Sequence, residues 1–327
     1  MATMKDVAKR AGVGVGTVSR VINHASGVKQ STLDKVNEAI KELNYIPDEY
    51  ARGLKTSSSR TIALILPTVW YPFFSEFAYY VEKNLADRDF KLLLCNSNGD
   101  PEEEKKYIKM IKQNKIDAII AITYSDIEQY IYSNIPFVSL DRYFDEKVSY
   151  VTSDNYQGGR LAAKELLKHG AKYLAYIGSY SKYSNGTMLR RNGFRDYLHE
   201  HQVGYQEIFL QEPVEHYTPY IKEMMKREPN TDGIFCHTDS QLLHFRKIFT
   251  ALGYRIPQDI QMIGFDGMRM AADLPIGVST IVQPVKKLAD GAVDLVLRKI
   301  KDPEAKNISK MYPVTFFEGN TTKNIDK

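Results

Sequence analysis

"MKDVAKRAGVGVGTVSRVIN", Met4 to Asn23, places two short helical segments on either side of a glycine-rich turn. The first segment, residues 4–11, follows Thr3, whose side chain can cap the helix. The second segment covers residues 15–23. Two helices joined by a short glycine turn and surrounded by basic residues are typical of a helix-turn-helix motif.

A third helical segment, residues 32–44, completes a small domain. Ser31 is expected to cap it, because Ser31 and Asp34 have the spacing of a capping box. Apolar residues recur at helical spacing through all three segments and predict one small core. They are Val7, Ala8, Ala11, Val18, Val21, Ile22, Val36, Ile40 and Leu43.

The charge of the 327-residue chain is unevenly distributed. Lys and Arg number 44 and Asp and Glu number 40, which gives a net charge of +4. Residues 1–60 hold 10 basic and 6 acidic residues, so the remainder is neutral. A basic N-terminal part on a neutral body is expected of a nucleic-acid-binding head, although chance alone could give an excess of this size.

The two cysteines, Cys95 and Cys236, lie in separate apolar runs and are expected to be buried, reduced thiols. No apolar run approaches the roughly 20 residues of a membrane span, and the N-terminus has no signal-peptide core. We therefore expect a cytoplasmic protein that has no membrane segment, metal or cofactor.

From Thr61 onward, short apolar strands alternate with amphipathic helices, which predicts parallel sheets of the α/β class. The length leaves room for eleven or more strands, which suits two doubly wound subdomains better than one sheet. Ligands of such sheets bind at the carboxyl ends of the strands. The clearest strands are 61–67, 91–96, 117–122, 136–140, 173–178, 232–237, 260–265 and 278–281, and the clearest helices are 73–88, 102–113, 156–169, 188–199, 241–252 and 285–301.

Enzyme motifs are missing from the sequence. "AGVGVGTVS" has the glycines of a dinucleotide-binding loop, but a helical, charged segment precedes it where that motif needs a strand. There is no phosphate loop, no nucleophile elbow and no metal-spaced His/Cys cluster. An α/β enzyme is therefore disfavoured. A transport receptor is disfavoured too, since it would need an export signal and no DNA-binding head.

Several segments together resemble the LacI/GalR family of bacterial transcription regulators over nearly the whole chain. They are the opening stretch, "STLDKVNEAIKELNYIPDEYARGL", "SDNYQGGRLAAKELLKHG", "RRNGF", "IPQDIQMIGFDG" and "STIVQP", and "LCNSNGDPEEEKKYI" with "SLDRYF" resembles the sucrose-operon type. The resemblance implies an α/β protein with an N-terminal helix-turn-helix head, a hinge helix, and a periplasmic-binding-protein-like core of two doubly wound parallel-sheet subdomains. The implied boundaries are 1–46 for the head, 47–60 for the hinge and 61–327 for the core, with an N-subdomain of about 61–155 plus 285–315 and a C-subdomain of about 156–284 plus the C-terminal end.

The family resemblance also implies a function. It is that of a homodimeric repressor of a carbohydrate-utilisation operon, which binds palindromic operator DNA and is switched by a sugar or sugar phosphate. A global regulator that uses a protein corepressor and a purine-type, corepressor-dependent repressor remain alternatives. Only eight residues follow "YPVTFFEG", without a heptad repeat, so we expect a dimer rather than a tetramer.

DNA-binding residues follow by position in the family. Val15 and Gly16 begin the second helix, whose first residues reach base edges, and Arg20 suits a bidentate bond to guanine. Gly16 departs from the family, because this position usually carries a side chain that helps select the operator. Thr3, Thr17, Ser19 and Asn23 are the expected further contacts of the head, and Ala51, Arg52, Leu54 and Lys55 those of the hinge, where Leu54 is the expected minor-groove wedge.

The family likewise implies an effector site in the core. Arg190, in "RRNGF", is expected to bind effector hydroxyls or a carboxylate, and Asp266 is the expected acid of the site. Phe73 and Phe74 fall where aromatic side chains line the pocket, although either could be core. Asp141, Asp154, Thr238, Asp239 and Gln283 are further candidates, of which Asp154 and Asp239 could instead cap helices.

Overall fold

The computed structural model describes residues 2–23, 25–46, 58–131, 135–144, 148–183, 185–271 and 273–324. The chain forms two compact units, Met1–Ser59, here the head unit, and Arg60–Lys327, here the core unit. Within the described residues, every helix is too short or too polar to cross a membrane.

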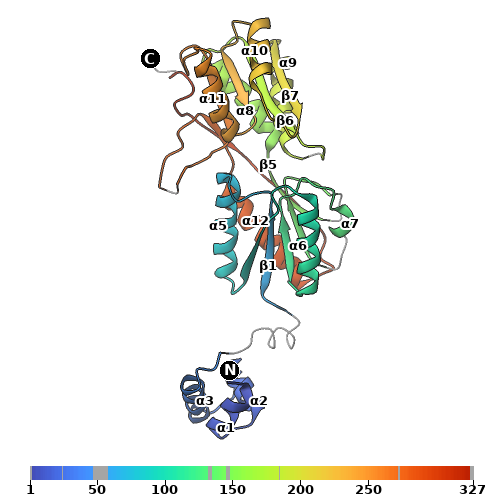
Figure 1. The fold of residues 1–327 in the computed structure, drawn as a ribbon, viewed down its shortest axis with the longest axis vertical. Helices are drawn as coiled ribbons and strands as arrows, with labels where there is room; N and C mark the ends of the chain where they lie inside the picture. The colour runs from blue at the N-terminus through green and yellow to red at the C-terminus, as the bar shows by residue number, and fades with distance from the viewer. Residues whose placement is uncertain are drawn as a thin grey trace. The chain divides into compact units, whose positions relative to one another are not determined.

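The head unit contains three helices, α1 (Met4–Ala11), α2 (Val15–Ile22) and α3 (Gln30–Glu42) (Figure 1). Of the nine apolar residues predicted from the helical spacing, five belong to its buried core cluster, which also includes Ala39 and Tyr45, and the other four, Ala11, Ile22, Ile40 and Leu43, pack against it. The predicted three-helix head with one small core is therefore confirmed.

The two predicted helix caps have different outcomes. Thr3 caps α1 in a capping box with Asp6, whose carboxylate accepts from the Thr3 amide at 2.8 Å. The prediction for Ser31 was wrong, because α3 already begins at Gln30 and no side chain caps it. The Asp34 carboxylate instead accepts from Gln30 Nε2 at 2.9 Å.

The core unit contains two six-stranded sheets (Figure 1). The first sheet has the order β11-β5-β4-β3-β1-β2 and the second β12-β10-β9-β8-β6-β7. All pairs are parallel, as predicted, except the antiparallel pair of β10 and β12. The strands are β1 (Thr61–Leu66), β2 (Lys91–Asn96), β3 (Ala118–Ala121), β4 (Phe137–Leu140), β5 (Ser149–Ser153), β6 (Leu174–Tyr180), β7 (Tyr205–Gln211), β8 (Gly233–Cys236), β9 (Gln261–Asp266), β10 (Thr280–Val282), β11 (Ser309–Tyr312) and β12 (Thr315–Phe317).

All eight predicted strands and all six predicted core helices are confirmed, within a few residues at their ends. The sequence analysis missed β5, β7, β11 and β12, of which β7, β11 and β12 lie at or near sheet edges and need no continuous apolar run. It also missed the helices α7 and α10. The core helices are α5 (Pro72–Ala86), α6 (Pro101–Gln113), α7 (Glu128–Ile131), α8 (Asn155–Lys168), α9 (Thr187–Glu200), α10 (Thr218–Arg227), α11 (Asp239–Ala251) and α12 (Val285–Lys301).

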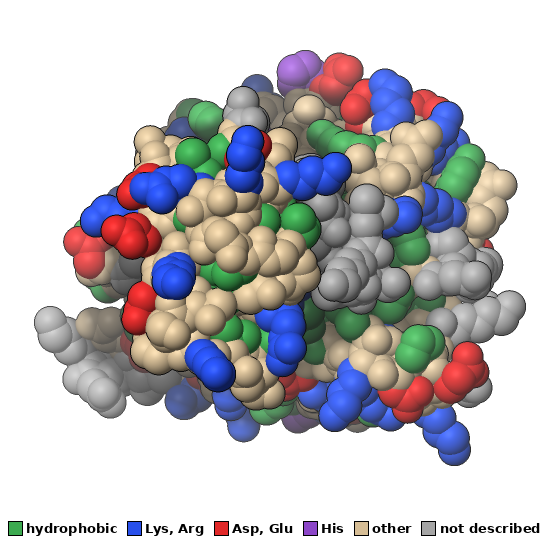
Figure 2. Space-filling model, turned by 90° about the horizontal axis from the view of Figure 1, so that it is seen from below, with side chains coloured by type: hydrophobic (Ala, Val, Ile, Leu, Met, Phe, Trp, Pro, Cys, Tyr) green, Lys and Arg blue, Asp and Glu red, His purple; other side chains and the backbone are tan. Residues whose placement is uncertain are grey.

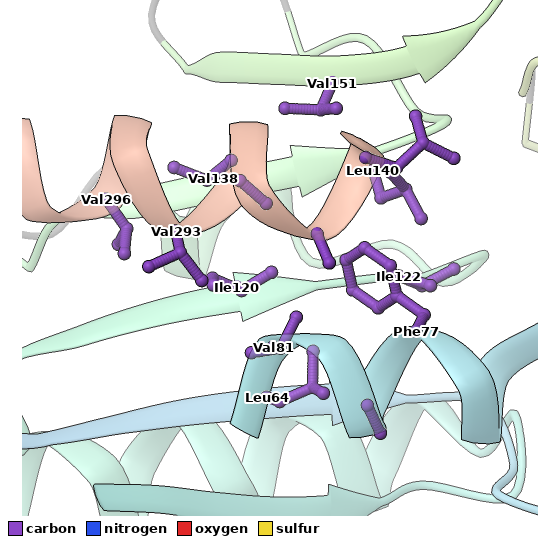
Figure 3. Close-up of a cluster of buried hydrophobic side chains, with 14 of the residues drawn as sticks. Leu64, Phe77, Val81, Ile120, Ile122, Val138, Leu140, Val151, Val293 and Val296 are labelled. Carbon is purple, nitrogen blue, oxygen red and sulfur yellow. The ribbon is translucent and has the colours of Figure 1, made fainter. Parts of the chain in front are cut away.

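The helix α12 packs on the first sheet although it follows a strand of the second. Figure 3 shows Val293 of α12 and Phe77 of α5 among the strand side chains Leu64, Ile120 and Val138. The chain therefore passes between the sheets at three described connections, from β5 to α8, from β10 to α12 and from β11 to β12. These crossings bring the carboxyl-end loops of the two sheets together.

Candidate effector site and DNA-binding surface

Arg190 of α9 is the centre of a buried polar cluster between the two sheets. Its side chain is 3% exposed. Nε donates to Asn155 Oδ1 and Nη1 to the His237 carbonyl, both at 2.7 Å. Nη1 also lies 3.5 Å from Asp266 Oδ1, and the guanidinium carbon lies 3.7 Å from the centre of the Phe265 ring. These contacts fix the guanidinium in one orientation.

Glycines allow this arrangement, because α8 and α9 approach more closely than side chains would permit. A β-carbon at Gly159 would lie 1.9 Å from the Arg190 carbonyl oxygen. A β-carbon at Gly193 would lie equally close to the Tyr156 carbonyl oxygen. The sequence motifs "YQGGR" of α8 and "RRNGF" of α9 are therefore linked, because each contains the glycine against which the backbone of the other helix packs.

A chain of hydrogen bonds runs from the first sheet to the second. Asp141, which follows β4, accepts from Thr152 Oγ1 at 2.8 Å. Thr152 Oγ1 accepts from Asn155 Nδ2 at 3.2 Å, and Asn155 in turn binds Arg190. At the other end, Gln283 Nε2 donates to Asp266 Oδ1 at 2.8 Å. Since Asn155 begins α8 and Gln283 precedes α12, two of the three crossings carry members of the network.

Burial is the main cause of the pKa shifts in this cluster. Burial raises the pKa of Asp266 to about 6, although Arg190 and the bond from Gln283 lower it. Burial also raises the pKa of Asp141, and burial together with the charge of Asp266 raises the pKa of Asp239. The pKa of His237 falls to about 3 on burial, so its ring is neutral, and Nδ1 accepts from the Ser179 amide at 3.3 Å.

Asp266→Asn should raise the thermal stability of the protein at neutral pH. The raised pKa means that the folded state binds more protons than the unfolded state between about pH 4 and 6. The free energy of unfolding contributed by Asp266 therefore falls as the pH rises through this window. An amide imitates the protonated acid, so we expect a gain of about 1–3 kcal/mol at neutral pH and little change near pH 4.

Thermal unfolding across a pH series measures this effect, with Asp294→Asn on the half-exposed face of α12 as the matched control. A lower melting temperature for Asp266→Asn at neutral pH would show instead that the ion pair with Arg190 outweighs the burial of the carboxylate.

The structure brings together five of the nine predicted effector residues, namely Arg190, Asp141, Asp239, Asp266 and Gln283. Asp239 does not cap α11, because its Oδ2 accepts from the Met268 amide at 2.7 Å. The cap is Thr238, which accepts from the Gln241 amide, and Asp154 caps α8 by accepting from the Gln157 amide. Phe74 lies in the core of the first sheet and Phe73 packs against that core.

The sequence analysis missed two members of the cluster. Asn155 joins Arg190 to the first sheet, and its place after β5 gave no sequence signal, because β5 itself was not among the predicted strands. Tyr124 follows β3, and the pKa of its half-buried phenol is raised because of burial and the nearby charge of Asp141. The signal for Tyr124 is a polar side chain at the carboxyl end of a parallel strand.

Two surface hollows lie elsewhere. One, of about 340 Å³, lies between α5 and α12, and one of about 300 Å³ lies beside β7 and α10. Neither is lined by a predicted effector residue. Arg190, Asp141 and Gln283 are each at most 4% exposed, so a ligand can reach them only if the two sheets move apart at the cluster.

On the head unit, the first residues of α2 are open to solvent. Val15 is 42% exposed, and a side chain at Gly16 would meet no atom within 4 Å. Arg20 is exposed, and its Nη2 donates to the Ser26 carbonyl at 3.0 Å. Asn23 donates to the Ser19 carbonyl at 2.7 Å, and Thr17 and Ser19 are half-buried.

The predicted contacts of the hinge lie outside the described residues. They are Ala51, Arg52, Leu54 and Lys55.

Figure 2 shows Lys and Arg spread over the viewed face, with Asp and Glu between them. The positive charge expected of a DNA-binding head is found in the charge excess of residues 1–60.

Two family models match the chain. One, described as bacterial regulatory proteins of the lacI family, matches residues 3–48. The other, described as periplasmic binding proteins and sugar binding domain of the LacI family, matches residues 59–316.

Individual relatives span the full length. A sucrose operon repressor from Streptococcus mutans is 34% identical over 309 residues, which cover 92% of this chain and 93% of that protein. A ribose operon repressor from Bacillus subtilis is 34% identical over 328 residues and covers all of both chains. The crystal structure of the lac repressor dimer bound to operator and the anti-inducer ONPF has a TM-score of 0.83 at 23% identity, over 99% of each chain. The predicted fold class, a helix-turn-helix head on a two-subdomain core, is thus confirmed.

Proposed function

The chain belongs to the LacI family of bacterial regulatory proteins, and on that premise we propose that it represses a carbohydrate-utilisation operon under the control of a sugar or sugar phosphate. It is a DNA-binding repressor of a non-enzymatic family. The relatives named for sucrose and ribose operons support the carbohydrate assignment. The observation that carries the proposal is the buried Arg190 network, which links the two sheets through their crossings.

We propose that a homodimer binds a palindromic operator in the cytoplasm. In each head, Val15 and Gly16 present the open end of α2 to base edges, and Arg20 binds a guanine. The further contacts of the head, which go to phosphates or lie beside the base contacts, come from Thr3, Thr17, Ser19 and Asn23. Ala51, Arg52, Leu54 and Lys55 contact the minor groove, with Leu54 as a wedge at the central base step.

Switching requires that effector binding change the angle between the subdomains. Effector hydroxyls compete for the bonds that Asn155 and Gln283 make to Arg190 and Asp266. Since both residues lie at crossings, altering these bonds changes how the two sheets are joined. Effector and operator must then change each other's affinity by the same factor, because coupling between two binding sites is reciprocal.

Selection from random duplexes tests the function. The full-length protein should recover an inverted repeat with a flexible pyrimidine–purine step, CG, at its centre, because two heads related by a two-fold axis read two half-sites. Mobility shifts on that operator, with and without sugars and sugar phosphates, then test carbohydrate control. Recovery of asymmetric sites would contradict the proposal that a symmetric dimer binds the operator. An operator affinity that no carbohydrate changes would point to control by a protein corepressor.

A further inference from the structure

We infer that the effector is an uncharged, hydroxyl-rich carbohydrate and that the Arg190 cluster discriminates against its phosphorylated form. This inference rests on the proposed function, in which the Arg190 cluster binds the effector. It concerns only the charge and the hydrogen-bonding character of that ligand.

The hydrogen bonds of the cluster leave the amide oxygen of Gln283 as an acceptor of fixed orientation without a partner in the described part of the chain. Gln283 is 3% exposed, and its Oε1 has no partner among the described residues. Its orientation is fixed, because Nε2 donates to the Asp266 carboxylate at 2.8 Å. A buried acceptor without a partner is costly, so a ligand that donates a hydrogen bond to Oε1 is favoured. A sugar hydroxyl can donate to Gln283 Oε1, whereas a phosphate dianion placed at this oxygen could only accept, so the phosphate group of a phosphorylated sugar is excluded from this place.

A second buried acceptor lies on α11. Gln241 Oε1 is also buried without a hydrogen-bond partner in the described chain. Here Ser179 fixes the amide, because Ser179 Oγ donates to Glu212 Oε1 at 2.8 Å and so accepts from Gln241 Nε2 at 3.5 Å. Gln241 lies beside the cluster, since its side chain interacts with His237. The interaction with the His237 ring occupies the Gln241 amide, so Gln283 Oε1 is the acceptor that a ligand hydroxyl can fill.

The charges of the cluster also disfavour a phosphorylated ligand. Arg190 supplies the positive charge that acts on Asp141 and Asp266, and Asp239 adds a third carboxyl to the cluster. Arg190 is already engaged by Asp266, Asn155 and the His237 carbonyl. The ring of His237 is neutral, because burial lowers its pKa to about 3. A buried phosphate would thus face carboxyl groups without an unpaired cation.

Other cations on the neighbouring loops do not alter this balance. Arg142 follows β4 next to Asp141, but its guanidinium donates to the Ser125 carbonyl and pairs with Glu128. Its guanidinium carbon also lies 4.9 Å from the centre of the Tyr183 ring. Lys182, after β6, and Arg269, after β9, are exposed to solvent, where water screens their charges.

Calorimetric titration of the full-length protein with matched pairs tests the inference. The pairs are sucrose and sucrose 6-phosphate, ribose and ribose 5-phosphate, and fructose and fructose 6-phosphate. In the pair that binds, the free sugar should bind at least about tenfold more tightly and should be the member that changes operator affinity. Equal or tighter binding of the phosphorylated member overturns the inference and leaves the proposed function standing. If neither member of any pair binds while the operator still binds, carbohydrate control fails and the inference fails with it.

A charge variant tests the mechanism. Asp141→Asn removes one carboxylate while it keeps the volume of the side chain, so the preference for the free sugar should fall about threefold to tenfold. Asp294→Asn, which removes an exposed carboxylate from α12, is the control and should leave the ratio unchanged. If Asp141→Asn binds the pair with the wild-type ratio, the charge argument is wrong. If Asp141→Asn does not fold, the wild-type pairs still decide the inference.

Discussion

Arg190→Ala should abolish the response to effector while leaving operator binding intact. The guanidinium makes two hydrogen bonds at 2.7 Å and faces Asp266 at 3.5 Å inside the cluster. In the proposed mechanism the effector takes over bonds that the guanidinium makes to Asn155. Each charge-assisted bond to the effector that is lost costs roughly 1.5–3 kcal/mol, so effector affinity should fall by about 10-fold to 100-fold. The head unit contains none of these groups, so its DNA contacts are unchanged.

Two further variants separate binding from folding. Arg190→Lys keeps a positive charge near Asp266 but loses the planar fork, so the protein should fold while effector affinity still falls. Arg191→Ala, on the same helix, removes the partly exposed pair with Glu207 and the contact with the Phe209 ring, and it should cost about 1–2 kcal/mol of stability without reaching the effector cluster. Calorimetric titration measures effector affinity, and circular dichroism checks the fold. A folded Arg190→Lys protein with full effector affinity would make the arginine a structural residue.

Much of the fold could be predicted because local patterns and tertiary packing agree. The head has apolar residues at helical spacing and a capping Thr3, and the interior strands β1, β3 and β9 are buried apolar runs. The polar segment "SYVTS" of β5 is different, because it becomes a strand only through pairing with β4 and β11 on either side. Sequence alone does not contain that pairing.

The effector cluster was predicted as a set of residues rather than as a network. Position in the family brought Arg190 and Asp266 into the site, but not the direction of any hydrogen bond. Asn155 becomes important only because the chain crosses between the sheets at that point. Thr238 and Asp154 act as N-caps, because each lies between the end of a strand and the start of a helix. Ligand contacts lie at the same positions of the chain. Parallel α/β folds place caps and ligand contacts at the same strand ends, so sequence cannot separate the two roles.

Arg20→Ala should weaken operator binding far more than binding to unrelated DNA. Arg20 is exposed on α2, and its bond to the Ser26 carbonyl is also exposed, so releasing the side chain towards DNA costs little. A bidentate contact to guanine contributes about 1–3 kcal/mol in each half-site, and a dimer has two half-sites. The expected loss of about 2–6 kcal/mol is a fall in operator affinity of about 30-fold or more.

Arg10→Ala is the matched control, because it removes the same charge from the same unit. Arg10 pairs with Glu42 at 2.6 Å on the α1–α3 side, and its side chain is 57% exposed. Both variants should lose a similar, salt-dependent share of non-specific affinity, since both reduce the positive charge of the head. Competition between the selected operator and a scrambled duplex then isolates base recognition. Only Arg20→Ala should lower the ratio of operator to scrambled affinity. An equal effect of the two variants would mean that Arg20 acts through its charge and that α2 reads the operator through Val15 and its neighbours instead.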